Sequence, residues 1–313
     1  MKLSRRKALS VIAMGVLGVR SSIVAAGRQA QAAGKPVTGP VSFRYCLNTS
    51  TISGKNPGLH RYIEIASRAG YHGIEIWVRD LEAALDAGHT LSSLSRFVED
   101  HGLVVENAIG FAPWMAPGEA GFEQMEREMH LLAGIGCRRI AAPPAGVSDE
   151  IPLDLFEAGE RYSRLLELGR QTGVMPQLEF WGSSPVLWHL GQVLMIAAVA
   201  DDPDVKILPD IYHMFRGGSG FHTLDMMSGS LIDVFHMNDY PAAKPREQQD
   251  DSDRVYPGDG AAPIYQILNS LRNMGGEKIL SLELFNRNYW EEDPVAVALR
   301  GLSKMKSLVG ELV

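Results

Sequence analysis

The chain alternates between strand-like and helix-like segments from Val41 almost to its end. Eight apolar runs of strand length occur, and each is followed by a helix-like segment. The expected strands cover residues 41–47, 73–77, 103–110, 138–143, 175–180, 205–210, 231–237 and 278–284. The expected helices include 58–69, 91–101, 121–135, 155–172, 262–274 and 293–309, with weaker signals after the fifth and sixth strands. Eight strand–helix repeats in about 280 residues predict a (β/α)8 TIM barrel.

A doubly wound open sheet is the rival architecture. It would be indicated by a glycine-rich phosphate-binding turn after the first strand. The sequence has the polar run Asn48 to Thr51 in that place instead. No linker rich in Pro, Gly or Ser divides residues 34–313, so we expect them to form a single domain with the barrel architecture.

Residues 1–33 have the features of an export signal. The paired Arg5 and Arg6 precede a short apolar stretch, and small residues around Ala32 end the segment. This order predicts a twin-arginine signal peptide and a periplasmic location. The apolar stretch is short and contains glycine, so we expect no stable membrane span after cleavage. An amphipathic amino-terminal anchor is the alternative.

The charge of the remaining chain excludes one class of partner. Residues 1–33 hold six of the 30 Lys and Arg and none of the 37 Asp and Glu, which leaves a net charge near −13. A phosphate backbone is bound through clustered basic residues, so nucleic acid is not an expected partner. The sequence leaves homo-oligomerisation open.

Four consecutive strands end in residues that can ligate a metal: Glu179, Asp210, His236 and Glu283. The carboxyl ends of parallel barrel strands meet on one face, so these side chains should converge. Carboxylates collected in a confined space repel one another unless a cation lies between them, and a divalent metal ion commonly fills that role. We therefore predict a metalloenzyme.

The motifs around these residues resemble the xylose-isomerase-like TIM barrel family, which includes sugar isomerases, ketose 3-epimerases and inosose isomerases or dehydratases. The matching segments are Gln-Leu-Glu179, Asp210-x-x-His213, His236-Met-Asn-Asp239, Ser-Leu-Glu283 and, in the second strand, Gly-Ile-Glu75. The resemblance implies that the four strand-end residues hold one divalent ion. Mn²⁺, Co²⁺ or Mg²⁺ suits such an oxygen-rich set, and Zn²⁺ is a further candidate.

The resemblance also implies a reaction. The family's chemistry is isomerisation or epimerisation of a sugar or keto-sugar by proton transfer next to a carbonyl, through a metal-stabilised enediolate. Glu179 and Glu283 would take and return the proton. We expect Glu75 to support the site through hydrogen bonds rather than to react. The substrate-binding candidates are His213, Trp181, Arg246 and Asn286.

Three other functions are compatible with parts of the pattern. A lyase or dehydratase acting on a 3-keto sugar or inosose would share the first step. An abasic-site-type endonuclease would need histidines after strands two and three, where the sequence has Trp77 and residues 110–113. A non-catalytic sugar-binding barrel would not need two candidate bases. The epimerases of free ketohexoses carry a further glutamate soon after strand five, and its absence from residues 180–185 leaves the sugar unidentified.

Overall fold

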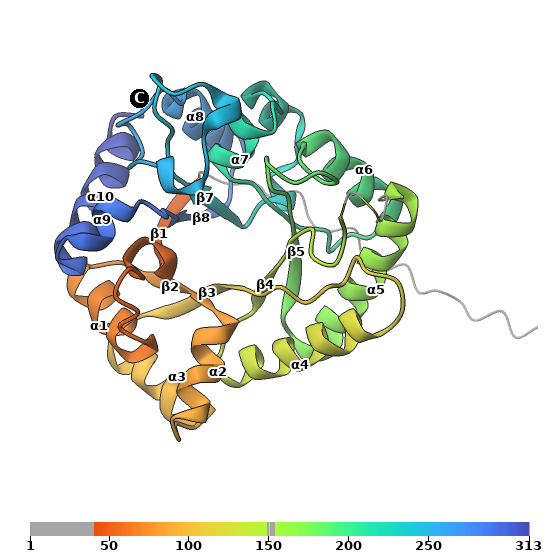
Figure 1. The fold of residues 1–313 in the computed structure, drawn as a ribbon, viewed down its shortest axis with the longest axis horizontal. Coiled ribbons are helices and arrows are strands. Elements are labelled where there is room, and N and C mark those ends of the chain that lie inside the picture. Colours follow the sequence, from red (N-terminus) through yellow and green to blue (C-terminus); the bar gives the residue numbers. More distant parts are fainter. Residues whose placement is uncertain (1–40, 149, 151–153, 313) are drawn as a thin grey trace, which may run out of the picture. The chain divides into compact units, whose positions relative to one another are not determined.

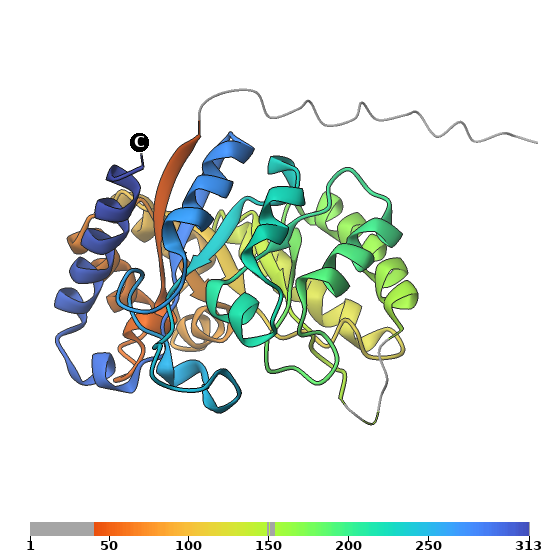
Figure 2. The same ribbon diagram turned by 90° about the horizontal axis from the view of Figure 1, so that it is seen from above.

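The computed structural model describes residues 41–148, 150 and 154–312, so the predicted signal peptide lies outside them. Eight strands lie at the centre of the described chain, with helices around them (Figure 1). At right angles to that view, the helices lie alongside the strands (Figure 2). The strands are β1 Ser42–Asn48, β2 Gly73–Trp77, β3 Val104–Ile109, β4 Arg139–Ala142, β5 Met175–Glu179, β6 Ile207–Leu208, β7 Val234–Met237 and β8 Glu277–Leu282.

Helices of one to five turns connect the strands. The α-helices are α1 Leu59–Ala69, α2 Val78–Asp86, α3 Leu91–Asp100, α4 Ala120–Gly134, α5 Leu155–Thr172, α6 Leu190–Ala200, α7 Ile211–Arg216, α8 Ile264–Met274, α9 Arg287–Glu291 and α10 Pro294–Gly310. Short 3-10 turns are η1 Thr49–Ile52, η2 Phe221–Met226, η3 Gly229–Leu231, η4 Arg246–Gln248 and η5 Asp251–Asp253. In the described part of the chain, no helix has the length and apolar character needed to cross a membrane.

The strand order confirms the predicted barrel and excludes the open sheet. One parallel ladder has the order β3-β2-β1-β8-β7, and a second has the order β4-β5-β6. The first strand therefore pairs with the last, with Cys46 opposite Ser281. A parallel bridge between Asp210 and His236 links the end of β6 to β7. Closure of this kind brings the carboxyl ends of β5 to β8 to the same face.

The predicted elements agree with the observed ones to within a few residues, but α2 and α9 were not expected. Val78 begins α2 directly after β2, with no loop between them, and α9 has only five residues. Gly70 follows α1 with φ 84°, a backbone conformation that is strained for other residues.

Side chains alternate between the barrel interior and the surrounding helices. Val234 and Ile279 belong to a small apolar cluster inside the barrel, whereas Leu178, Phe235 and Leu282 pack in the larger core that includes the helices. This alternation places the polar strand-end residues of β5, β7 and β8 on the interior side, where they can meet.

A group of ion pairs stabilises the strands at the opposite end from their carboxyl termini. Asp233 lies 2.8 Å from Lys206 Nζ and 3.2 Å from Arg139 Nε, and Glu106 pairs with Arg44. Burial alone would raise the pKa of Asp233, but Lys206 and Arg139 outweigh it and lower the pKa. This acid therefore favours the folded state in its ionised form.

Candidate active site

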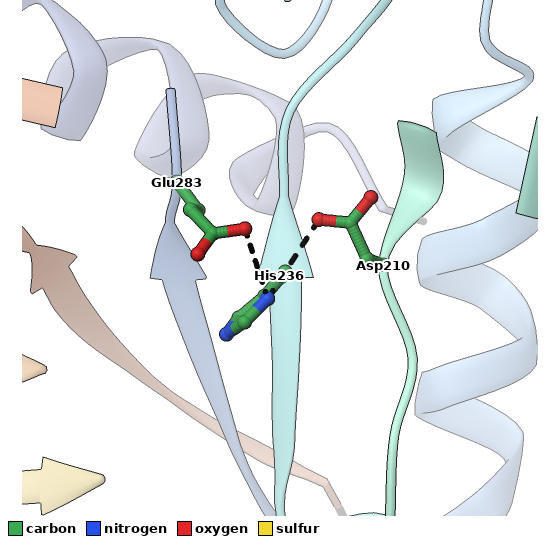
Figure 3. A group of neighbouring side chains, drawn as sticks. All are labelled: Asp210, His236 and Glu283. Carbon is green, nitrogen blue, oxygen red and sulfur yellow. Dashed lines mark ion pairs between the residues drawn. The ribbon is translucent and has the colours of Figure 1, made fainter. Parts of the chain in front are cut away.

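Three of the four predicted metal ligands lie together. Asp210, His236 and Glu283 point toward one another from the ends of β6, β7 and β8, and each is buried (Figure 3). One ligand atom from each residue lies within 4.8 Å of the others. His236 Nδ1 is 3.2 Å from Glu283 Oε2 and 3.7 Å from Asp210 Oδ2.

Asp210 is fixed by hydrogen bonds to both of its carboxylate oxygens. It is the N-cap residue of α7, and Oδ1 accepts a hydrogen bond of 2.7 Å from the backbone N–H of His213. Oδ2 accepts a hydrogen bond of 2.7 Å from Asn238 Nδ2, whose own Oδ1 accepts from the Tyr212 backbone. Asn238 belongs to the motif after β7 but was not predicted as a site residue.

Glu75 determines how the His236 ring is oriented. Its Oε1 lies 3.0 Å from His236 Nε2, and its two oxygens also accept hydrogen bonds from Asn48, Asn107 and Ser281. With Nε2–H donated to Glu75, Nδ1 is the ring nitrogen that faces Asp210 and Glu283, and binding of a metal ion there would require Nδ1 to lose its proton. The supporting role predicted for Glu75 agrees with these contacts.

The charges around His236 and Glu75 favour their ionised forms. Burial would lower the pKa of His236, but the carboxylates of Glu283 and Glu75 outweigh it and raise that pKa well above its usual value. Burial would likewise raise the pKa of Glu75, but the charge and the hydrogen bond of His236 help to lower it. The two side chains thus stabilise each other's charge in a site that water does not reach.

Glu179 and Glu283 have different electrostatic surroundings. Burial, together with the nearby carboxylates of Glu283 and Asp210, raises the pKa of Glu179 to about 8, although His236 opposes the shift. Its Oε2 is buried without a hydrogen-bond partner. For Glu283, contacts with His236 and Arg254 overcome the effect of burial and lower the pKa. These surroundings favour the protonated form of Glu179 more than that of Glu283.

This donor set fits a divalent metal ion. The carboxylates of Asp210 and Glu283 converge with the His236 imidazole, while Glu179 lies outside this group and lines the cavity. Buried polar atoms are normally satisfied, and two buried atoms, His236 Nδ1 and Glu179 Oε2, lack hydrogen-bond partners. These atoms are available to a metal ion, in addition to the Arg254 guanidinium that already pairs with Asp210 and Glu283. Oxygen-rich coordination with one imidazole suits Mn²⁺, Mg²⁺, Co²⁺ or Zn²⁺.

Arg254 enters the site from the long loop between β7 and α8. Its Nη1 donates to Asp210 Oδ2 at 3.0 Å and to Glu283 Oε2 at 2.8 Å, and its Nη2 donates to Asp251 Oδ1 at 2.6 Å. Burial would lower its pKa, but these three carboxylates raise it. The basic residue of this loop that the sequence predicted to bind substrate was Arg246 rather than Arg254.

Arg246 lies elsewhere. It is in η4 on the outer part of the loop, where its half-exposed side chain pairs with Glu247, and it does not line the cavity described below. A loop without hydrophobic periodicity gives no indication in the sequence of which side chains turn inward. Two backbone hydrogen bonds between Asp239 and Val255 direct Arg254 toward the strands.

A cavity of about 250 Å³ opens above the strand ends. Glu179, Glu283 and two of the predicted substrate-binding residues, His213 and Trp181, line it. Burial and the neighbouring Arg254 lower the pKa of His213, so its ring is neutral near pH 7. Asn286 does not line the cavity. Its side chain donates to the Arg254 backbone carbonyl at 2.9 Å and therefore supports the loop that carries Arg254.

The comparisons with known proteins agree with this geometry. The model of the "Xylose isomerase-like TIM barrel" family matches residues 63–308. The chain belongs to this family. Among curated relatives, the inosose isomerase of Bacillus velezensis is 25% identical over 258 residues, which cover 80% of this chain and 91% of the relative. The inosose isomerase of Halalkalibacterium halodurans is 26% identical over 258 residues, which cover 80% of this chain and 90% of the relative.

Several solved structures share the fold. A crystal structure of IolI protein with a bound zinc atom matches with a TM-score of 0.79 and 22% identity, covering 86% of this chain and 99% of that one. D-psicose 3-epimerase in the presence of D-fructose matches with a TM-score of 0.67 and 16% identity, covering 85% and 99%. The probable 3-DHS dehydratase AsbF of Bacillus anthracis matches with a TM-score of 0.67 and 17% identity, covering 84% of this chain and 98% of that one.

Proposed function

We propose that the protein is a divalent-metal-dependent isomerase or epimerase that moves a proton next to the carbonyl of a sugar or keto-sugar. The observation that carries this proposal is the buried convergence of Asp210, His236 and Glu283 beside Glu179, with His236 Nδ1 and Glu179 Oε2 left without hydrogen-bond partners. The inosose isomerase relatives, which match over most of their length, support the same class of reaction.

The four strand-end residues would hold the ion. Glu179, Asp210 and Glu283 would supply carboxylate oxygens, and His236 would supply Nδ1, the atom that its contact with Glu75 leaves free. When bound, a divalent ion polarises a carbonyl oxygen and stabilises negative charge that develops beside it. Mn²⁺, Co²⁺ and Mg²⁺ are the ions that we propose, with Zn²⁺ as a further candidate because the IolI structure contains it.

The two glutamates would divide the proton transfer. Glu283 is held as an anion by His236 and Arg254 and can accept the proton of a C–H bond next to the carbonyl. Glu179, which also lines the cavity, would deliver a proton back to the substrate. His213 would orient the sugar above these carboxylates, and Trp181 would contact another part of the substrate.

A lyase or dehydratase reaction is the alternative, because loss of a hydroxyl or glycosidic oxygen would follow the same proton abstraction. The fold shared with AsbF is compatible with it. Product analysis separates the two reactions, since an isomerase gives a product of unchanged mass and a dehydratase gives one that has lost water. We also propose that residues 1–33 direct the folded protein to the periplasm.

The test is metal depletion followed by reloading. Protein stripped with a chelator should be inactive on a panel of ketoses and inososes, and single additions of Mn²⁺, Co²⁺, Mg²⁺ or Zn²⁺ should restore turnover. Gln124→Ala, a substitution on α4 outside the cavity, serves as a handling control and should behave like wild type. Full turnover by the stripped protein would contradict the proposal, as would failure of every metal to restore it on the entire panel.

A further inference from the structure

Four aromatic side chains form a continuous arc along one side of the cavity, in the order Phe285, Trp77, Phe111 and Trp181. Successive ring centroids are 6.2, 5.3 and 6.0 Å apart, within the range of aromatic contacts. The four residues follow or end β8, β2, β3 and β5. We call this group the aromatic arc.

The side chains of the arc differ in their exposure to solvent. Trp77 is almost fully buried, and its Nε1 donates to Asn48 Oδ1 at 3.2 Å, which fixes the ring. Phe111, at the other side of Trp77, is 43% exposed. A large apolar side chain at the mouth of a cavity is unfavourable in water unless something covers it, and apolar surface of this kind marks binding sites.

The charged side chains that line the cavity are mainly acidic. Among the described residues that line the cavity, Arg254 is the one basic side chain whose charge is permanent. Its four terminal N–H groups are directed to Asp210, Glu283, Asp251 and His213, and its remaining donor, Nε, is buried without a partner. Arg79 lies over the Trp77 ring at 4.1 Å but does not line the cavity.

This balance disfavours a phosphate or carboxylate on the substrate. Glu179, Asp251 and Glu283 already line the cavity, and any divalent ion held there would be offset by its own carboxylate ligands. An added anion would meet repulsion without a free guanidinium or ammonium group to bind it. The ligand chemistry that fits is uncharged.

The arc is also longer than one sugar needs. A pyranose ring stacks its C–H face on one aromatic ring, and the arc offers three successive steps of more than 5 Å each. A sugar placed against Glu179 and Glu283 would leave the outer part of the arc, formed by Phe111 and Trp181, uncovered.

We infer that the site takes an uncharged carbohydrate with an apolar ring substituent, which lies along Phe111 and Trp181 while the sugar lies against Glu179 and Glu283. The inference deepens the proposed function and relies on it only for the placement of the sugar. Phe111 and Trp181 are then the residues that determine specificity for the substituent.

Binding of matched probes to Mn²⁺-loaded protein tests this inference by calorimetry. Phenyl β-D-glucopyranoside should bind about fivefold to tenfold more tightly than methyl β-D-glucopyranoside, the scale expected for one added aromatic contact. Glucose 6-phosphate should bind more weakly than glucose. Equal affinities for the phenyl and methyl glycosides, no measurable binding of either, or tighter binding of the phosphate would overturn the inference.

Two variants locate the effect. Phe111→Ala should abolish the preference for the phenyl glycoside and leave the affinity for the methyl glycoside unchanged. Phe156→Ala removes an exposed phenylalanine on α5 outside the cavity and should change neither. A phenyl preference that survives Phe111→Ala would place the substituent elsewhere and refute the assignment.

These binding measurements do not depend on turnover. A phenyl preference that is lost in Phe111→Ala, in a protein that converts no sugar, would support the substrate class and contradict the proposed reaction. Metal-dependent conversion of small sugars without any phenyl preference would support the proposed reaction and contradict the substrate class.

Discussion

Replacing Glu75 by glutamine should weaken metal binding although Glu75 is not one of the proposed ligands. The carboxylate is fully buried and receives four hydrogen bonds, two on each oxygen: Asn107 and His236 on Oε1, and Asn48 and Ser281 on Oε2. Glutamine has the same shape but offers one oxygen and one NH₂ group. Two of the four donors would therefore face another donor.

The cost follows from how the donors can adapt. If the new NH₂ group faces His236, the ring can accept a hydrogen bond at Nε2 only by moving its proton to Nδ1, the atom proposed to bind the metal. Loss of a carboxylate that orients a metal-bound histidine typically weakens metal affinity about 10-fold to 100-fold. This factor corresponds to about 1.4–2.8 kcal/mol.

Metal affinity of the variant should be measured by competition with a fluorescent chelator, and the tautomer of His236 by its ¹⁵N chemical shifts in metal-free protein. Glu128→Gln is the matched control. Burial raises the pKa of Glu128, as it would that of Glu75, and Glu128 lies on α4 outside the cavity. We expect its metal affinity to equal that of wild type. Wild-type affinity of Glu75→Gln, or an equal loss in both variants, would refute the reasoning.

Three further predictions follow from the described contacts and the sequence. His236→Ala should lower metal content and thermal stability together, whereas His213→Ala should retain the metal and lose substrate affinity. Metal analysis and calorimetry measure these effects, and equal metal loss in both variants would contradict the division of roles. Because basic neighbours lower the pKa of Asp233, its contribution to stability is present above about pH 4 and lost as pH falls through the native pKa. Asp233→Asn should therefore reduce the free energy of unfolding by about 1–2 kcal/mol at pH 7 but much less at pH 3, measured by urea denaturation. Changing Arg5 and Arg6 to lysine should leave folded protein in the cytoplasm, measured by cell fractionation; normal export would contradict the signal assignment.

The sequence predicted the barrel because each strand carries its own signal. Apolar runs of five to seven residues, such as the one ending at Glu179, are bounded by helix caps and glycines that punctuate the chain. The order of eight such units leaves few topologies. Three of the four ligand candidates came together for the same reason, since strand ends of one parallel barrel share a face.

The loops could not be predicted in the same way. Arg254 lies 18 residues beyond His236 in a loop whose path is set by the pairing of Asp239 with Val255 and by four backbone N–H groups bound to the Asp239 carboxylate. Neither interaction leaves a periodic trace in the sequence. The aromatic arc was hidden similarly, because Phe111 and Phe285 come together only after the barrel closes.

The turnover rate of the glutamine variants of Glu179 and Glu283 tests most directly whether these two glutamates transfer the proton. Each variant keeps an oxygen for the metal but removes a carboxylate that can carry a proton. On a substrate that metal-free protein cannot convert, we expect Glu179→Gln and Glu283→Gln to retain metal and to turn over about 100-fold or more slowly than wild type. Near-normal turnover by both metal-loaded variants would contradict proton transfer by these glutamates.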